Sequence, residues 1–249
     1  QLVGWGLGGL LFATIGLLPT TFIILILYII SSFLMLFLPK AEVEVLESET
    51  NLEILLKGWK LVARDSRLRL FVSANLLEIF SNTIWVSSII LVFVTELLNK
   101  TESYWGYSNT AYSIGIIISG LIAFRLSEKF LAAKWESILF PLVAMAIVTL
   151  TILYFPNAQM FLVFSALVGM LSQLKEVPES VFLQETVEEN NLVNVYSVLE
   201  VISTLAFSVF VLLMSYITES FGISISFWLS AICLMIEAIL IYIRRDYFK

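Results

Sequence analysis

Histidine is absent from the sequence, and cysteine occurs only once, as Cys233. A single cysteine cannot form a disulfide within the chain. Without histidine, the usual zinc ligand sets and any Ser-His or Cys-His nucleophile pair are also excluded. Charged residues are scarce as well: they make up 14% of the chain, whereas soluble domains contain about 25%. The sequence therefore lacks the commonest hydrolytic and metal centres, and its composition is not that of a soluble domain.

Long apolar runs take the place of the missing charges. Hydrophobic residues account for 59% of the 249 residues. Most of them lie in runs of about 18 residues or more, the length that a helix needs to cross a bilayer. The sequence thus predicts an all-α integral membrane protein, a polytopic helical bundle with about eight transmembrane helices in this chain. The spans are expected at residues 1–16, 17–38, 70–98, 105–124, 138–155, 161–174, 195–217 and 223–243.

One polar segment, residues 39–69, interrupts these runs. Inside it, apolar residues recur on one helical face and charged residues gather on another. The apolar face carries Leu52, Leu55, Leu56, Trp59 and Val62, and the other face carries Glu53, Lys57, Lys60 and Arg64. A basic amphipathic helix of this kind either lies along the membrane surface or packs on the ends of neighbouring helices. The sequence leaves both interpretations open.

The lysines and arginines indicate an orientation. If the spans alternate across the membrane, all of the 14 basic residues except Lys100 fall on one side. Because basic loops are retained in the cytoplasm, we expect linker 39–69 and the C-terminus to be cytoplasmic in a multi-pass protein of the plasma membrane. No signal peptide is visible, and Gln1 already lies in an apolar run, so we expect the chain to be part of a longer protein.

The span at residues 70–98 contains a carboxylate, Glu78, about 12 Å from its start at 1.5 Å per residue. The hydrocarbon layer is about 30 Å thick, so this side chain lies inside the membrane, where an ionised acid costs roughly 2.5–3.5 kcal/mol or more. Asn75, Asn82 and Trp85 recur at three- and four-residue spacing and share its helical face. This polar stripe predicts a substrate or proton pathway. The alternative is a structural glutamate that hydrogen-bonds a neighbouring helix.

Two further polar groups occur near expected span ends. Glu200 lies about 7.5 Å from the start of its span and is either a pathway residue or one that reaches the cytoplasmic interface. The second group lies where the span at 161–174 is expected to end, and we interpret it as a solvated helix end, with a gate as the alternative. It consists of Gln173, Lys175, Glu176 and Glu179.

Three stretches give the chain a family resemblance. Residues 4–9, Gly-Trp-Gly-Leu-Gly-Gly, resemble a fifth-helix antiporter motif, Gly-Pro-x-x-Gly-Gly, with Trp5 in place of the proline. Residues 57–69 are similar to the segment before the seventh helix in the macrolide-efflux and siderophore-exporter branch. Leu183-Gln184, Glu188-Glu189 and Val195 stand where that branch has a signature after its tenth helix. With six spans after a cytoplasmic linker, the chain resembles the C-terminal two-thirds of a major facilitator superfamily transporter.

The resemblance implies three parts. Residues 1–38 would be the last two helices of the N-terminal transporter half, residues 39–69 a cytoplasmic linker with an amphipathic helix, and residues 70–249 the six-helix C-terminal half. The substrate cavity of this family lies between the halves, which rock around it, and the polar stripe of 70–98 would line it. Gly4, Gly8 and Gly9, with Trp5 among them, would pack the fifth helix closely. Glu237 falls in the twelfth helix, which is peripheral in the family, so no cavity role is expected for it.

The function that follows from the resemblance is secondary active transport. We expect proton-coupled efflux of hydrophobic or amphipathic small molecules, of the drug, antibiotic or siderophore class, by alternating access, with Glu78 as the coupling residue or the partner of a cationic substrate. Such a protein uses a proton gradient and no cofactor, has the lipid bilayer and a small-molecule substrate as partners, binds no nucleic acid, and works as a monomer once the full chain is present. The alternatives are an importer on the same fold, a membrane-embedded enzyme, and a non-transporting scaffold or sensor.

Overall fold

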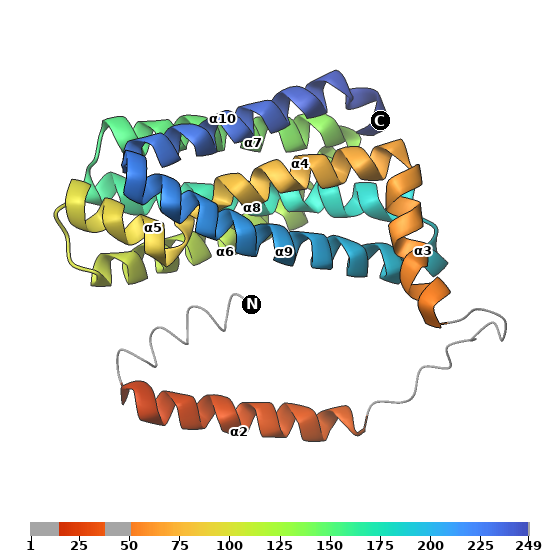
Figure 1. Cartoon of the computed structure of the whole chain (residues 1–249), viewed down its shortest axis with the longest axis horizontal. Coiled ribbons are helices and arrows are strands. Elements are labelled where there is room, and N and C mark those ends of the chain that lie inside the picture. Colours follow the sequence, from red (N-terminus) through yellow and green to blue (C-terminus); the bar gives the residue numbers. More distant parts are fainter. Residues whose placement is uncertain (1–14, 38–50, 249) are drawn as a thin grey trace. The chain divides into compact units, whose positions relative to one another are not determined.

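The computed structural model describes residues 15–37 and 51–248 (Figure 1). The chain divides into two compact units, residues 1–50 and 51–249. In the first unit, helix α2 (Leu17–Met35) is built of apolar residues. Its one proline, Pro19, stands in the first turn, where a helix loses no hydrogen bond to proline.

The second unit is a bundle of helices. Helices α4, α7, α8, α9 and α10 run beside one another, and the short helix α3 is set across one end (Figure 1). No described residue of either unit forms a β-strand. The helices are α3 (Asn51–Arg64), α4 (Ser66–Asn82), α5 (Ser87–Val92), α6 (Ser103–Ala132), α7 (Lys134–Tyr154), α8 (Ala158–Thr186), α9 (Glu189–Phe221) and α10 (Ile223–Ile243), with shorter turns η1 (Thr83–Trp85), η2 (Phe93–Leu97) and η3 (Arg245–Phe248).

Five described helices are long and apolar enough to cross a membrane: α2, α7, α8, α9 and α10. A sixth span results if the bent pair Ser66–Trp85 and Ile89–Leu97 is counted as one. The expected all-α membrane bundle is therefore confirmed. Of the eight expected spans, residues 1–14 of the first lie outside the described residues, and that at 105–124 lies within the 30-residue helix α6, which is not among the five or six.

The expected single helix over 70–98 is wrong, because the structure breaks it in the middle. Helix α4 ends at Asn82, a 3₁₀ turn covers Thr83–Trp85, and Val86 is extended (φ −68°, ψ 143°). The segment continues as α5 and a π-helical turn at an angle of 42° to α4. Discontinuous spans of this kind are common at the midplane of transporters.

The expected helix end at Leu174 is also wrong. Helix α8 continues without a break to Thr186 and includes Pro178. The polar residues after Leu174 predict a solvated connection. In the structure, buried Lys175 and mostly buried Glu179 are paired inside the bundle, and the helix continues through them.

Two glycines set the distance between α6 and α8. A Cβ atom on Gly115 would lie 1.8 Å from the Ala166 carbonyl oxygen, and one on Gly169 would lie 2.2 Å from the Tyr112 carbonyl oxygen. Only residues without a side chain allow the two backbones to approach this closely, as is typical of helix pairs in membranes. Phe93 belongs to the main core, where its ring is tilted against Phe161 of α8 and Phe227 of α10.

Helix α3 packs on α9, which agrees with the second interpretation of the amphipathic segment. A Cβ atom on Gly58 would lie 2.4 Å from the Asn194 carbonyl oxygen, and Val62 is buried beside Val195. The next helix, α4, is capped by Asp65, whose Oδ1 accepts a hydrogen bond from the Arg67 backbone N–H at 2.7 Å. Partial burial raises the pKa of the Asp65 carboxyl group, but the hydrogen bonds and the charge of Arg67 outweigh this effect and hold the pKa below its ordinary value.

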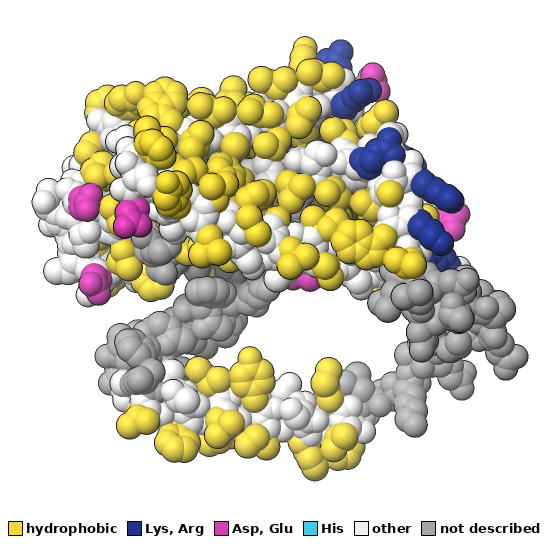
Figure 2. All heavy atoms as spheres, in the orientation of Figure 1, with side chains coloured by type: hydrophobic (Ala, Val, Ile, Leu, Met, Phe, Trp, Pro, Cys, Tyr) yellow, Lys and Arg dark blue, Asp and Glu magenta, His cyan; other side chains and the backbone are white. Residues whose placement is uncertain are grey.

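The surface of this unit is apolar over most of the face seen in Figure 2, as expected for helices that contact lipid. On this face, the lysine and arginine side chains gather at the end of the bundle where α3 lies. The asymmetry agrees with the sequence pattern that predicts a cytoplasmic linker, and the orientation in the membrane stays a prediction.

Candidate functional site

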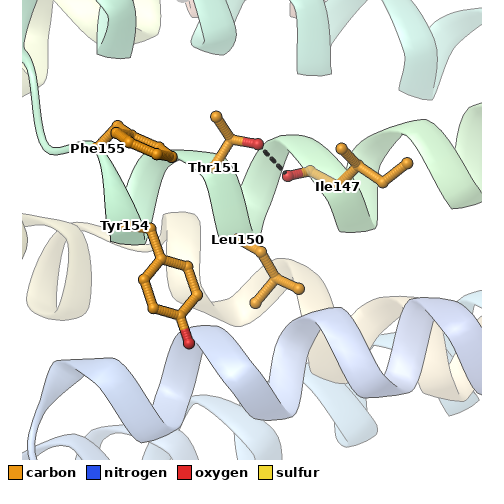
Figure 3. A pocket seen from close by; sticks show the side chains of 5 residues that line it. All are labelled: Ile147, Leu150, Thr151, Tyr154 and Phe155. Carbon is orange, nitrogen blue, oxygen red and sulfur yellow. Dashed lines mark hydrogen bonds between the residues drawn. The ribbon is translucent and has the colours of Figure 1, made fainter.

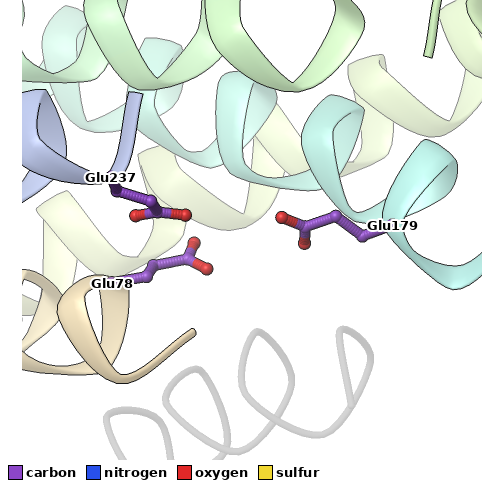
Figure 4. A group of neighbouring side chains, drawn as sticks. All are labelled: Glu78, Glu179 and Glu237. Atoms are coloured by element: carbon purple, nitrogen blue, oxygen red, sulfur yellow. The ribbon is translucent and has the colours of Figure 1, made fainter. Parts of the chain in front are cut away.

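The polar centre of the bundle is a lysine surrounded by carboxyl groups from three helices. Lys175 of α8 donates hydrogen bonds from Nζ to Glu78 Oε2 of α4 at 2.7 Å and to Glu179 Oε1, one turn further along α8, at 2.6 Å. Glu237 of α10 places its Oε1 3.7 Å from the same Nζ. Figure 4 shows the three carboxyl groups pointing toward one another. We refer to Glu78, Lys175, Glu179 and Glu237 as the carboxylate cluster.

The four side chains of the cluster are mostly or fully buried, so a net charge on the cluster costs free energy. The exposed fraction of the side chain is 2% for Lys175, 13% for Glu78, 15% for Glu179 and 0% for Glu237. Fully ionised, three carboxylates and one ammonium group would carry a net charge of −2. Uncompensated buried charge is costly, and such groups neutralise themselves by binding a proton.

Glu237 is the carboxyl group best placed to hold that proton. Neither of its oxygens makes a hydrogen bond within the part of the chain that the structure describes, although both are buried. Glu78 and Glu179 each accept a hydrogen bond from the Lys175 ammonium group, whereas Glu237 lies 3.7 Å from it. The cluster is thus divided into one ion-paired set and one isolated acid.

The helices that carry the cluster are tied together around it. Lys175 and Glu179 share a face of α8 because they are four residues apart. The hydroxyl groups of Ser81 and Ser230 share a hydrogen bond of 2.7 Å and so connect α4 to α10, close to Glu78 along α4. Carboxylate oxygens of the three glutamates all lie within 4.8 Å of one another, a spacing that suits a cation, and the Lys175 ammonium group is the cation held there.

A small cavity of about 80 Å³ with both polar and apolar walls lies between α6, α8 and the broken span. It is large enough for water molecules, which its hydroxyl and amide groups could bind. Tyr112, one of its lining residues, places its hydroxyl 3.1 Å from Ser172 Oγ, one turn before Lys175 on α8. The lining residues are Trp85, Ile90, Ser108, Asn109, Tyr112 and Ser165.

The residues predicted to form the polar stripe of 70–98 separate in the structure. Glu78 joins the carboxylate cluster. Asn75 accepts a hydrogen bond from Ser203 of α9 at 3.0 Å, Asn82 is half-buried at the end of α4, and Trp85 stacks on Phe161 and lines the small cavity. The break after Asn82 separates Trp85 from the other three, because it changes the direction of the chain before Trp85. Asn75 and Glu78 share α4 but pair with different helices, α9 and α8.

The other predicted residues lie elsewhere. Glu200 is exposed on α9. Gly4, Trp5, Gly8 and Gly9 lie outside the described residues. Glu200 is therefore not part of the carboxylate cluster, and the roles of the four N-terminal residues stay predictions.

Sequence reasoning missed three members of the cluster. Lys175 and Glu179 were interpreted as a solvated helix end, and Glu237 was set aside as peripheral. One signal was available for the first two: a Lys-Glu pair four residues apart, with no glycine nearby, is compatible with a continuing helix. Glu237 stands inside an apolar run, and an acid in such a position is functional by default.

A second, larger groove is apolar. It has a volume of about 380 Å³ and lies along the end of α7, where Tyr154 and Phe155 form part of its wall (Figure 3). The Thr151 hydroxyl in this groove donates to the Ile147 carbonyl oxygen at 2.7 Å. The groove is suited to contact with lipid chains and offers no ionisable group comparable to the carboxylate cluster.

Comparison with known proteins agrees with this architecture. The sequence profile of the Major Facilitator Superfamily matches residues 71–249. The chain is 28% identical over 242 residues to the uncharacterized MFS-type transporter YfmI of Bacillus subtilis (strain 168), an alignment that covers 96% of this chain and 60% of the relative. It is 26% identical over 242 residues to a second such transporter of that strain, YjbB, covering 97% of this chain and 59% of the relative.

No solved structure matches the chain. The chain spans about 60% of the length of the curated relatives that it matches. The profile match covers the second unit from residue 71 onward, including all four residues of the carboxylate cluster, and leaves out α3 and the first turn of α4. This multi-pass helical membrane chain belongs to the Major Facilitator Superfamily.

Proposed function

We propose that the full-length protein is a secondary active transporter of the plasma membrane. It exports hydrophobic or amphipathic small molecules, of the drug, antibiotic or siderophore class, in exchange for protons by alternating access. Membership of the family and the two relatives named as MFS-type transporters support transport as such. The export direction and the exporter branch rest on the motifs at residues 4–9 and 57–69.

The observation that carries proton coupling is the carboxylate cluster. Three largely buried carboxyl groups and one lysine cannot all be ionised at low cost, so the cluster binds a proton. It releases that proton when its access to water changes. When the cluster is closed off from water, the protonated state is favoured. When water reaches the cluster at its partly exposed side, the proton leaves, and this alternation couples proton movement to the opening of the cavity.

The remaining parts of the proposal concern the whole protein. Residues 1–38 supply two helices of the N-terminal half, residues 39–69 a cytoplasmic linker, and residues 70–249 the C-terminal half. Gly4, Gly8 and Gly9 pack the fifth helix closely and limit proton leakage. The protein works as a monomer without a cofactor, because the proton gradient supplies the energy and the two halves of one chain enclose the substrate.

An importer on the same fold is the main alternative, and the direction of flux separates it from an exporter. A non-transporting scaffold or sensor predicts no flux that depends on the cluster. A membrane-embedded enzyme predicts turnover in detergent without any gradient.

The test uses the full-length protein in inverted membrane vesicles. A proton gradient is imposed, and the uptake of amphipathic dyes and drugs is followed in the wild type, in Glu78→Gln and in Glu219→Gln, which changes an exposed glutamate of α9. We expect gradient-dependent uptake in the wild type and in Glu219→Gln. In Glu78→Gln we expect its loss at equal protein level, because the variant removes one of the two carboxylates that hold Lys175.

A protonophore serves as the second control and should abolish the wild-type signal. Unchanged uptake in Glu78→Gln would remove this residue from the coupling mechanism. Uptake by right-side-out vesicles in place of inverted ones would identify an importer.

A further inference from the structure

The two sides of the carboxylate cluster differ in their access to solvent. This inference rests on the proton-coupled transport proposed above and concerns its substrate and the residue that carries the proton. Glu78 and Glu179 hold the Lys175 ammonium group and remain partly exposed, whereas Glu237 is fully buried. The same Nζ atom thus lies between an accessible pair of carboxylates and one sealed acid.

The lysine is close enough to serve either side. Its Nζ is 3.7 Å from Glu237 Oε1, which is only about 1 Å longer than a charge-assisted hydrogen bond. A change in the side-chain torsions of Lys175 covers this distance without movement of α8. The unsatisfied oxygens of Glu237 would then gain the hydrogen bond that they lack.

The geometry points to a site that exchanges a cation for a proton. A substrate that carries an amine or quaternary ammonium group binds Glu78 and Glu179 in place of the Lys175 ammonium. The lysine moves to Glu237 as that carboxyl group gives up its proton. Lys175 is in this sense a tethered competitor of the substrate.

The charges balance in both states. With Glu237 protonated, two carboxylates and one ammonium group give the cluster a net charge of −1. With Lys175 paired to ionised Glu237 and the substrate paired to the other two acids, the net charge is again −1. The O–H bond of Glu237 breaks and its proton passes to Lys175 Nζ. Lys175 has given one of its own protons to water on the accessible side of the cluster, so it stays an ammonium group and one proton reaches the solvent. A buried site that keeps its charge constant avoids the cost of taking an additional charge into the membrane.

Among the described residues, no ionisable group outside the carboxylate cluster is placed to exchange a proton or form an ion pair with Glu237. The charges that act on it are those of Lys175, Glu78 and Glu179. Cys233 lies one turn earlier on α10 and is half-buried. Of the helices packed on α10, α7 carries ionisable residues only in its first and last turns, and those of α9 are all exposed. They are Lys134, Glu136 and Tyr154 on α7, and Glu189, Tyr196, Glu200, Tyr216 and Glu219 on α9.

Proton release on binding tests the exchange directly. The full-length protein is purified in detergent, transferred to weakly buffered solution with a pH indicator, and titrated with tetraphenylphosphonium or ethidium. Both are permanent cations that have no proton of their own to release at neutral pH. We expect the wild type to release about one proton per bound cation, so its affinity should tighten about tenfold per pH unit between pH 6 and 8.

Variants at one position identify the source of the proton. Glu237→Gln has the shape of the protonated acid and should fold, bind the cation more weakly, release no proton and show an affinity that is independent of pH. Glu237→Asp keeps an ionisable group and should restore proton release, which a purely structural role would not explain. Glu219→Gln on α9 should behave as the wild type in every respect.

Three results would overturn the inference: proton release by Glu237→Gln at the wild-type level, cation binding by the wild type without proton release, or no binding of either cation. If Glu237→Gln is not monodisperse, Glu237→Asp decides, and an affinity independent of pH in that variant contradicts the exchange.

Gradient-driven uptake in vesicles without cation-linked proton release would reject this inference alone. Absence of gradient-driven uptake of any compound would reject the proposed function itself.

Discussion

At the scale of single residues, Lys175 is the centre of the carboxylate cluster, because it is the counter-ion of two partly buried acids and the neighbour of a third. The sequence made Glu78 recognisable, since an acid in the middle of an apolar run costs free energy and requires a reason. It did not reveal which residues would pair with it. Lys175 and Glu237 lie 97 and 159 residues further along the chain, and a pairing over such separations depends on how three helices pack, which no local pattern encodes.

We predict that Lys175→Ala destabilises the protein far more than Lys134→Ala. Removing one partner of a buried pair leaves uncompensated charge and costs about 3–5 kcal/mol. Lys134 also pairs with a glutamate, Glu185, but that carboxylate is 55% exposed, and such pairs contribute about 0–1 kcal/mol. Thermal unfolding of both full-length variants in detergent measures the difference. Equal shifts of Tm would mean that water reaches Lys175 and that the cluster is solvated.

At the scale of elements, the sequence was informative wherever hydrophobicity alone determines structure. The apolar runs predicted the helices, and the amphipathic pattern predicted α3 within 39–69. The continuation of α8 past Leu174 was missed because its polar residues are paired inside the bundle, and the break at Val86 was missed because no glycine or proline marks it. Both errors concern positions where tertiary contacts override local composition.

The close packing of α6 on α8 gives a prediction at this scale. We expect Gly115→Ala to destabilise the protein, because its Cβ would lie 1.8 Å from a backbone oxygen of α8 and the helices would have to separate. Gly120→Ala on the same helix is the matched control, since its Cβ would meet no atom within 4 Å. In an α-helix, alanine is favoured over glycine by about 1 kcal/mol, so the control should be neutral or stabilised. Thermal unfolding measures both, and a stabilised Gly115→Ala would show that α6 and α8 are further apart than described.

At the scale of the whole molecule, the carboxylate cluster has two sides that differ in their access to solvent. The ion-paired acids Glu78 and Glu179 are the accessible side of the cluster, and Glu237 on α10 is its sealed side. A rocking motion between two transporter halves would change water access at the first side and leave the second dry. The division of the cluster into these two sides therefore allows substrate and proton to be bound by different residues while one lysine connects them.

This division predicts the driving force of transport. Because the cluster carries the same net charge in both states of the proposed exchange, one monovalent cation leaves for each proton that enters, and no net charge crosses the membrane. Movement of one net charge would couple transport to the membrane potential by about 2.3 kcal/mol per 100 mV, equivalent to about a fifty-fold change in accumulation.

In inverted vesicles of the full-length protein, we expect nigericin, which collapses the pH gradient, to abolish accumulation of a permanent cation. Valinomycin with potassium, which collapses the potential, should leave accumulation unchanged once passive uptake into protein-free vesicles is subtracted. Accumulation that follows the potential would require more than one proton per cation, and hence a second proton-binding residue besides Glu237.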